Sequence, residues 1–385
     1  MKHTLYIICA LALVACADKQ QQAAEGAEPA QYVWEAEAMP SLAVSGEEGL
    51  AGAVAGIVNG KLTVWGGANF PDVPAAEGGK KRIWGYEYAL ADSGWTRNES
   101  VDQPIAYAAT AAVPTGVVVM GGNDGTGQTD KAWLWLSDGT RTAFAPLPQP
   151  TENAAGTYGD GYVYIIGGQT PDGASARAYR IPADGKGEWE ELPPLPRAPR
   201  VQCSAAWLGG RLYVAGGYDP AEGTVNSTLF SWAPGETSWT FVDSLRKPGE
   251  MMTTTLVGGT MLADSAMGRL LFIGGVDATI FQDAISRPMR LEAARAEGNT
   301  AAVERLEAEA KEYMHHEPSW YCFTNAMTSI DLRDGEHRYE VSHNALARAG
   351  AAVVQADSVV WVVNGELKPG IRANTVVRLV RRRSR

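Results

Sequence analysis

Cysteine and histidine are scarce in this 385-residue sequence, which contains four of the former and five of the latter. Their spacing resembles no metal-ligand motif, so no metal site is predicted. Cationic residues are outnumbered as well. The formal net charge is −11, which disfavours nucleic acid as a partner because phosphate binding requires a basic surface. The basic run from Arg381 to Arg385 is interpreted as a solvated tail.

Long hydrophobic runs are also missing. The apolar run from Leu5 to Ala15 is too short to cross a membrane as a helix. It follows Met1-Lys2-His3 and leads through Leu-Val-Ala to Cys16, which is the pattern of a bacterial lipoprotein signal. We therefore expect a signal peptide over residues 1–15, a lipid on Cys16, a flexible tether over residues 16–31 and one domain over 32–385. The domain would be anchored in the periplasm or at the outer membrane by lipid alone.

Two cysteines, Cys203 and Cys322, remain within that domain. In an oxidising compartment they could form a disulfide. The alternative is two small side chains buried on separate strands, and the sequence leaves both open.

The dominant pattern is an apolar, strand-like segment that ends in a glycine pair. It occurs five times, ending in Gly66-Gly67, Gly121-Gly122, Gly167-Gly168, Gly216-Gly217 and Gly274-Gly275. A sixth copy ends in Asn364-Gly365. A repeat of roughly 50 residues is typical of β-propellers, and the preceding segments are rich in alanine and glycine, as crowded strands near an axis require. The sequence predicts an all-β fold of six four-stranded blades.

An aromatic residue marks the outermost strand of five blades and is expected to pack between neighbouring blades. These residues are Trp95, Phe144, Trp189, Trp239 and Tyr339. The sixth blade has no such strand at its end, because only one segment, Asn374 to Val380, follows Arg372. Tyr32 to Pro40 has the form of the missing strand. We therefore predict that the N-terminal strand completes the last blade and closes the ring.

The interval between the fifth and sixth copies holds a helical insertion at about residues 279–316. Val303, Leu306, Ala310 and Tyr313 recur at helical spacing, and Gly298-Asn299 is expected to separate this helix from an earlier one. We expect the insertion to wall or cover the mouth of the central channel. The alternative is a helical ornament on an outer surface or against a second subunit.

Loops that enter the inner strands and loops that follow the glycine pairs must emerge on one face of a propeller. That face is predicted to carry Glu366, Lys368 and Arg372 from the sixth copy, and Arg200, Gln202 and Arg348 from loops ahead of inner strands. A further loop brings the cations Lys80-Lys81-Arg82 to this face, where they either attract an anion or are merely solvated.

Lys368-Pro369-Gly370 forms a tight turn between Glu366 and Arg372 and fixes these two side chains relative to each other. An arginine offers a planar fork that matches a carboxylate, and a glutamate can accept and return a proton. The alternative is that Glu366 and Arg372 simply pair with each other.

The segment Asn364 to Arg372, NGELKPGIR, closely resembles the characteristic segment of bacterial N-acetylneuraminate epimerases, the sialic acid mutarotases, which are six-bladed Kelch propellers. Arg200-Val-Gln202 with the following CSAAWLGGRLYVAGG, and YCFTNAMTSID after the insertion, resemble the same family. The resemblance covers nearly all of the chain after residue 30. In the better-known enzymes the segment lies in mid-chain, so this sequence resembles a cyclically permuted branch, a change that a closed ring tolerates.

The resemblance implies that Glu366 is the proton acceptor of a mutarotase and that Arg372 assists it, at the carboxylate of an acidic sugar. Arg200, Gln202, Arg348 and Lys368 are expected to contact this substrate. It further implies that no cofactor is needed and that the protein forms a homodimer. The acid that serves the ring oxygen stays open between water, Lys368 and a residue of the insertion.

Two other classes remain as alternatives. A non-catalytic Kelch propeller could bind a glycan or a protein through the same loops. A copper-radical propeller would need a cluster of tyrosine, histidine and cysteine ligands, which is not found in the sequence.

Overall fold

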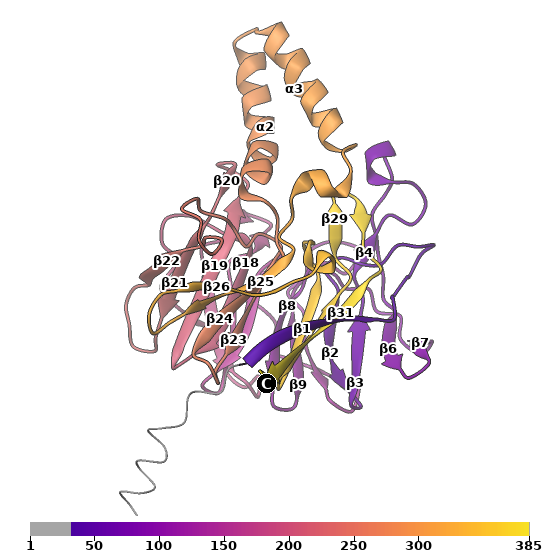
Figure 1. Cartoon of the computed structure of the whole chain (residues 1–385), viewed down its shortest axis with the longest axis vertical. Helices are drawn as coiled ribbons and strands as arrows, with labels where there is room; N and C mark the ends of the chain where they lie inside the picture. The colour runs from indigo at the N-terminus through magenta and orange to yellow at the C-terminus, as the bar shows by residue number, and fades with distance from the viewer. Residues whose placement is uncertain (1–31, 385) are drawn as a thin grey trace, which may run out of the picture.

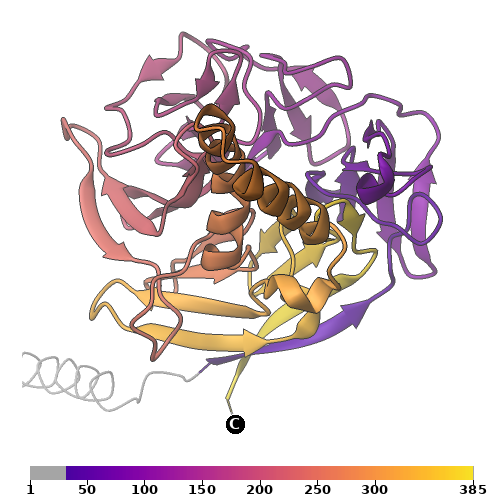
Figure 2. The same ribbon diagram turned by 90° about the horizontal axis from the view of Figure 1, so that it is seen from above.

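The structure, a computed structural model, describes residues 32–384. Within these residues, six antiparallel sheets surround a common axis, as Figures 1 and 2 show. The predicted all-β, six-bladed propeller is therefore confirmed. The expected signal peptide, Cys16 and tether lie outside the described residues.

Each blade runs from an inner strand at the axis to an outer strand at the rim. Blade 1 comprises β2 (Val54–Val58), β3 (Lys61–Trp65), β6 (Glu87–Ala91) and β7 (Gly94–Asn98). Blade 2 comprises β8 (Ala109–Val113), β9 (Gly116–Met120), β10 (Ala132–Leu136) and β11 (Arg141–Ala143). Blade 3 comprises β12 (Ala155–Gly159), β13 (Tyr162–Ile166), β16 (Ala178–Pro182) and β17 (Glu190–Glu191). Blade 4 comprises β18 (Val201–Leu208), β19 (Arg211–Asp219), β21 (Thr228–Trp232) and β22 (Thr240–Ser244). Blade 5 comprises β23 (Thr260–Asp264), β24 (Arg269–Ile273), β25 (Ala326–Asp331) and β26 (His337–Ser342). Blade 6 comprises β27 (Ala352–Ala356), β28 (Val359–Val363), β31 (Val376–Arg383) and β1 (Tyr32–Met39).

Short elements decorate the loops between these strands. They are the ribbons β4 (Ala68–Asn69) with β5 (Arg82–Ile83), β14 (Gln169–Thr170) with β15 (Gly173–Ala174) and β29 (Glu366–Lys368) with β30 (Ile371–Arg372), the strand β20 (Thr224–Val225) beside β19, and the 3₁₀ turns η1 (Ala75–Glu77), η2 (Pro318–Tyr321) and η3 (Asn344–Leu346).

The N-terminal strand closes the ring as predicted. β1 pairs antiparallel with β31 over its whole length, from Tyr32 opposite Arg383 to Met39 opposite Val376. Figure 2 shows this strand, in indigo, completing the last blade beside the yellow C-terminal strand. Because β31 would otherwise present an open edge, the pairing satisfies its backbone groups.

The interpretation of the C-terminal basic run as a solvated tail is wrong for Arg381 and Arg382. Both belong to β31. The Arg382 side chain donates to Glu35 at 2.6 Å, and Arg381 donates to Asp264 at 2.6 Å. Glu35 belongs to β1, so Arg382 contributes to ring closure, whereas Asp264 ends β23 and Arg381 therefore joins blades 5 and 6.

Tryptophans near the outer strands connect neighbouring blades, as predicted. Their indole N–H groups donate to proline carbonyls of the preceding blade at 2.7–2.8 Å: Trp95 to Pro40, Trp189 to Pro146 and Trp239 to Pro193. The prediction fails at the fifth blade. Tyr339 is 54% exposed because it lies on the solvent side of β26.

The insertion forms a helical hairpin of α2 (Ala278–Ala296) and α3 (Thr300–Tyr313), separated at Gly298-Asn299 as predicted. Asp277 caps α2 and Asn299 caps α3 through side-chain oxygens that accept backbone N–H groups. Leu306 is buried between the helices, whereas Ala310, expected on the same apolar side, is exposed. Neither helix is long and apolar enough to cross a membrane among the residues described.

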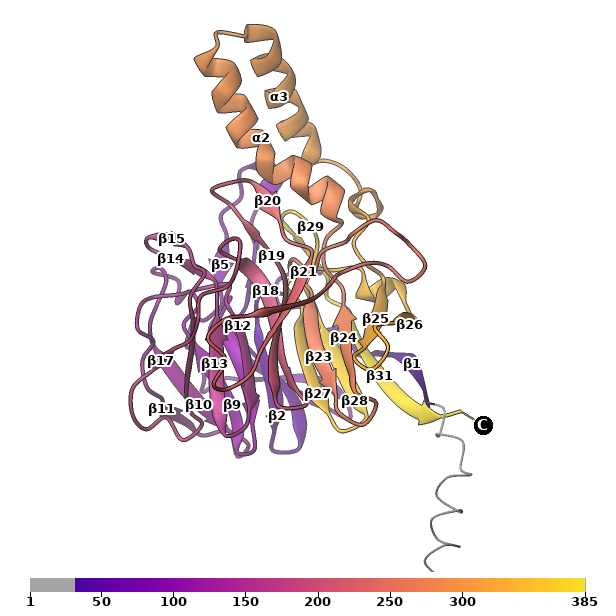
Figure 3. The same ribbon diagram turned by 90° about the vertical axis from the view of Figure 1, so that its left-hand side faces the viewer.

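The hairpin rises from one face of the ring, as Figures 1 and 3 show. Seen from above in Figure 2, it crosses the middle of the propeller. At its base, the Gln282 amide accepts from the Val225 N–H of β20 at 2.8 Å. The insertion therefore stands on the face that carries the Glu366 loop, as expected for a wall at the channel mouth.

Candidate active site

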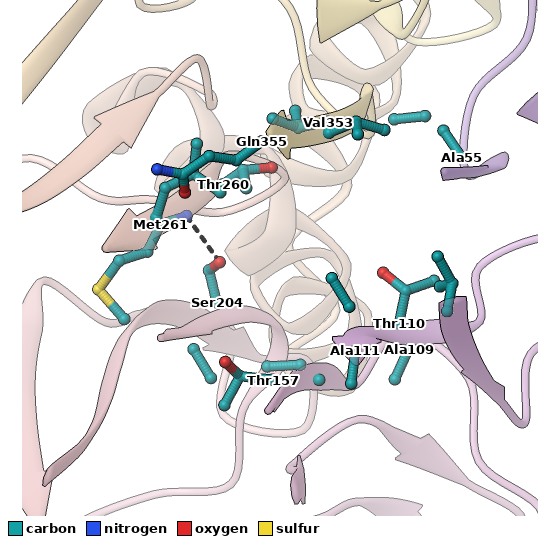
Figure 4. Close-up of a pocket in the computed structure, with 18 of the residues that line it drawn as sticks. Ala55, Ala109, Thr110, Ala111, Thr157, Ser204, Thr260, Met261, Val353 and Gln355 are labelled. Carbon is teal, nitrogen blue, oxygen red and sulfur yellow. Dashed lines mark hydrogen bonds between the residues drawn. The ribbon is translucent and has the colours of Figure 1, made fainter. Parts of the chain in front are cut away.

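The six inner strands enclose an axial cavity of about 760 Å³. Figure 4 shows that small side chains surround it, among them Ala55, Ala109, Thr157, Ser204 and Val353 from five different strands. Small side chains let neighbouring inner strands come close enough to form hydrogen bonds with each other. The Ser204 hydroxyl accepts from the Met261 N–H of the next blade at 2.8 Å. The alanine-rich pattern of these strands thus leaves room for a ligand of sugar size.

Glu366 lines this cavity at one end. It directly follows Asn364-Gly365, the sixth copy of the repeat, and it lies opposite Arg372 in the two-stranded ribbon of β29 and β30. Its Oε1 accepts from the Arg372 guanidinium at 2.7 Å and from the Gly370 N–H at 2.9 Å. Within residues 32–384, Oε2 accepts no hydrogen bond from protein, and the side chain is 30% exposed. One carboxylate oxygen is therefore fixed while the other is available.

Arg372 does not line the cavity. Its side chain is 3% exposed, and the guanidinium lies 5.4 Å from the centre of the Phe70 ring. Its Nε donates to the Ala68 carbonyl at 3.4 Å. The expectation that Arg372 reaches the sugar carboxylate directly is not supported by this placement. The sequence left open whether Glu366 pairs with Arg372 or serves the site. In the structure Glu366 pairs with Arg372 and also faces the cavity.

A second carboxyl group, Glu48, lies near Arg372. Burial raises the pKa of the Glu48 carboxyl, and the positive charge of Arg372 partly offsets that rise. Its Oε2 is buried without a partner among the described residues. No motif surrounds Glu48 in the sequence, so only the folded structure associates it with the site.

Lys368 is held by the helical insertion, not by the cavity. Its ammonium donates to the His316 carbonyl at 2.7 Å, just after α3. His316 stacks on Trp320 with ring centres 3.8 Å apart, and Tyr313 packs edge-on against Tyr321. Lys368 therefore fastens the Glu366 ribbon to an aromatic cluster at the base of the hairpin.

Glu366 is close enough to this cluster to influence its phenols. Burial raises the pKa of Tyr313 to about 12, and Tyr321 and the negative charge of Glu366 act in the same direction. Burial and the charge of Glu366 also raise the pKa of Tyr321. Both phenols therefore stay neutral at physiological pH beside the Glu366 carboxylate.

Arg200 and Arg348 occupy equivalent positions in blades 4 and 6 and are 0% and 2% exposed. Arg200 donates to the Gly216 carbonyl at 3.0 Å and to the Thr228 hydroxyl at 2.7 Å. Arg348 donates to the Asn364 carbonyl and the Thr375 hydroxyl, both at 2.7 Å. Each guanidinium thus joins the second and third strands of its own blade. Neither lines the cavity, so the expected contact with substrate is not supported for either residue.

Gln202 does line the cavity, and it belongs to a ring of six equivalent residues, one at the entry to each inner strand. Gln202 is the second residue of β18, whereas the other five lie two residues ahead of their strands. All six have left-handed backbone angles: Gly52 (φ 65°), Tyr107 (59°), Asn153 (55°), Gln202 (55°), Gly258 (69°) and Gly350 (61°). Five hydrogen bonds of 2.7–2.9 Å link them around the axis, each from one N–H to the carbonyl of the preceding position. Residues with side chains avoid this conformation at a cost of about 1 kcal/mol or more.

Sequence reasoning identified Gln202 but missed Tyr107 and Asn153. The signal was present, because aligning the blades on their glycine pairs puts both residues in register with Gln202.

The two remaining thiols do not pair. Cys203 is buried on β18, and burial raises its pKa to about 11, whereas Cys322 is exposed after η2. The described residues contain no group of three or more histidine, cysteine or acidic side chains arranged to hold a metal ion.

Fold and site together define a six-bladed β-propeller with a carboxylate, braced by an arginine, at the mouth of its axial cavity. A family model described as N-acetylneuraminate epimerase matches residues 144–383, which is more than half of the chain. The chain therefore belongs to the N-acetylneuraminate epimerase family.

Individual relatives are more distant. An N-acetylneuraminate epimerase of Pasteurella multocida (strain Pm70) is 29% identical over 237 residues, covering 60% of this chain and 57% of that protein. One of Escherichia coli (strain K12) is 27% identical over 236 residues, covering 60% and 59%. A solved structure titled "Structure of YjhT" aligns with a TM-score of 0.47 and 25% identity, covering 58% of this chain and 61% of that one. The chain thus spans less than two thirds of the length of these relatives.

Proposed function

We propose that the protein is a mutarotase that interconverts the α and β anomers of N-acetylneuraminic acid or a related acidic sugar. The observation that carries this proposal is the position of Glu366 at the cavity, with Oε1 held by Arg372 and Gly370 and Oε2 available. Membership of the epimerase family supports the reaction type and the choice of sugar.

In this mechanism Glu366 Oε2 accepts the proton of the anomeric hydroxyl. The anomeric oxygen becomes a carbonyl as the bond between the anomeric carbon and the ring oxygen breaks, and the ring oxygen takes up a proton from water. Rotation next to the open-chain carbonyl exposes its other face, the ring oxygen attacks that face, and the two proton transfers run in reverse. This acid-base chemistry requires no cofactor.

The role of Arg372 is to hold Glu366, since it touches no part of the cavity. It orients the carboxylate through the ion pair at 2.7 Å. We assign attraction of the substrate's carboxylate to Lys81 instead. Its ammonium lies 5.0 Å from the ring centre of Tyr107, which lines the cavity, and its side chain is exposed.

Glu366→Gln tests the proposal, because glutamine keeps an oxygen for Arg372 and Gly370 but cannot accept the proton. We expect anomer exchange of N-acetylneuraminate, followed by NMR, to slow by roughly 10²-fold or more. Glu77→Gln, on an exposed turn of the neighbouring loop, removes the same charge and should leave the rate unchanged. If the intact protein does not accelerate the exchange, the assignment is wrong for this sugar.

The same variant separates this proposal from its rival. A Kelch propeller that only binds a glycan or protein needs no proton acceptor, so Glu366→Gln would leave its function intact. Retained sugar binding with lost exchange favours the mutarotase.

We further propose that the protein works as a homodimer in the cell envelope, anchored through lipid on Cys16. These two proposals rest on the resemblance and on the lipoprotein pattern of the N-terminus. Light scattering of the purified domain measures the oligomer. Cys16→Ser should release the protein from the membrane fraction, and a variant that stays there would contradict the lipid anchor.

A further inference from the structure

The ring of left-handed residues at the cavity mouth is divided into two halves. Gly258, Gly350 and Gly52 follow one another in blades 5, 6 and 1, so the three glycines are contiguous around the axis. Blade 6, at the centre of this glycine half, carries Glu366. The other half, blades 2 to 4, presents side chains.

Polar side chains occupy that second half: Tyr107, Asn153 and Gln202. All three line the cavity and are half-buried. Among the described residues, the side-chain amides of Asn153 and Gln202 take part in no hydrogen bond, although each could donate and accept several. Asn153 lies in blade 3, directly across the ring from blade 6.

The backbone gives a reason to regard these side chains as functional. Glycine adopts the left-handed conformation without strain, and the fold uses it at three of the six positions. Tyrosine and glutamine take the same conformation only with strain, and within residues 32–384 neither side chain offsets that strain with a hydrogen bond. Strain retained at a cavity mouth points to a role toward a ligand.

The three glycines differ in how much room each has for a side chain. A Cβ at Gly52 would lie 2.4 Å from the Tyr107 ring, and one at Gly258 would lie 2.7 Å from Ala349 Cβ. At Gly350 the nearest atoms would be 3.8 Å away, which is ordinary contact. The absence of a side chain at 350 is therefore not required by packing. Gly350 lines the cavity directly after Ala349, which pairs with Glu366 in an isolated β-bridge.

We propose that this ring is the specificity-determining element of the cavity. The anomeric centre of the sugar occupies the glycine half beside Glu366, and Tyr107, Asn153 and Gln202 bind its uncharged polar groups, hydroxyls and an amide, from the opposite half. The inference rests on the proposed function, because it positions the sugar within the same cavity.

Asn153→Gly and Gln202→Gly test the polar half. Each installs the residue that the fold already uses at equivalent positions, so the melting temperature should not fall. We expect KM for N-acetylneuraminate to rise about three- to tenfold in each variant, as the loss of a hydrogen bond to a ligand predicts, with kcat changed less than about threefold. An unchanged KM in both variants would overturn the proposal.

Gly350→Asn tests the glycine half. Asparagine tolerates left-handed angles, as Asn153 itself shows, and Gly350 has room for a Cβ, so the ring should fold. The new side chain would enter the cavity beside the bridge between Ala349 and Glu366. We expect kcat/KM to fall more than tenfold, while backbone strain lowers the melting temperature by no more than about 2 °C. A folded variant with normal kcat/KM would show that the sugar does not lie there.

Binding measurements separate this inference from the proposed function. If the intact protein does not exchange anomers but binds N-acetylneuraminate by saturation-transfer NMR, the mutarotase proposal fails, and weaker binding by Asn153→Gly and Gln202→Gly still supports the ring. If exchange is fast and both variants bind normally, the ring fails alone. Absence of any binding to the intact protein overturns both.

Discussion

Trp34→Ala probes how strongly the N-terminal strand holds the ring together. Trp34 of β1 is 7% exposed and packs in a cluster that joins the two last blades. Leu271 and Met327 contribute from blade 5, and Val360 and Val377 from blade 6. The residue therefore closes the ring through side-chain burial as well as through backbone pairing.

The size of the effect follows from that burial. Truncating a buried tryptophan to alanine costs about 3–5 kcal/mol. Unfolding entropy near the melting temperature is about 2.1 cal/mol/K per residue, or roughly 0.7 kcal/mol/K for a propeller of about 350 residues. Trp34→Ala should therefore lower the melting temperature by about 4–7 °C.

Far-UV circular dichroism is a suitable assay because it does not depend on tryptophan fluorescence. Tyr339→Ala is the matched control: it truncates an exposed aromatic residue on the neighbouring outer strand and should shift the midpoint by less than about 1 °C. Deleting residues 32–40 should be more severe than Trp34→Ala and should promote aggregation, because it exposes the edge of β31. If the deletion and Trp34→Ala both melt like the intact protein, strand closure does not stabilise the ring.

Two further predictions concern pH. The buried Asp331 carboxylate accepts from Arg333, Arg338 and Arg269, which hold its pKa well below the usual range. That stabilisation exists above the unfolded pKa of about 4 and is lost at lower pH. Asp331→Asn should therefore lower the free energy of unfolding, measured by urea titration, by about 2–3 kcal/mol near pH 7 and by progressively less below pH 4. A loss that does not change with pH would contradict the ion pairs. Burial raises the pKa of Glu48, so its ionised form opposes folding once the pH exceeds the unfolded value, and Glu48→Gln should raise the melting temperature more at pH 8 than at pH 4. The reverse order would mean that Arg372 stabilises the charged form.

The sequence alone was sufficient for the blade count, the position of the insertion and the strand that closes the ring. These features depend on local patterns, since each glycine pair ends a strand within its own repeat, and the second helix of the insertion shows its own periodicity after the break at Gly298-Asn299. Counting strands then assigned Tyr32 to Pro40 to the last blade. Glu366 could be singled out because its copy of the repeat departs from the other five.

Only the tertiary structure decided what the charged residues do. Arg200, Arg348 and Arg372 look alike in sequence as cations on the loop face, yet all three side chains are buried and bound to protein groups. Arg382 pairs with Glu35, which lies 347 residues earlier in the chain.

The division of the mouth ring into glycine and polar halves is a property of the same kind. Each of its six residues comes from a different blade, and their left-handed angles and mutual hydrogen bonds exist only once the ring is closed. The repeat aligns most of these six positions in the sequence, but burial and contact between distant segments determine whether their side chains meet a ligand.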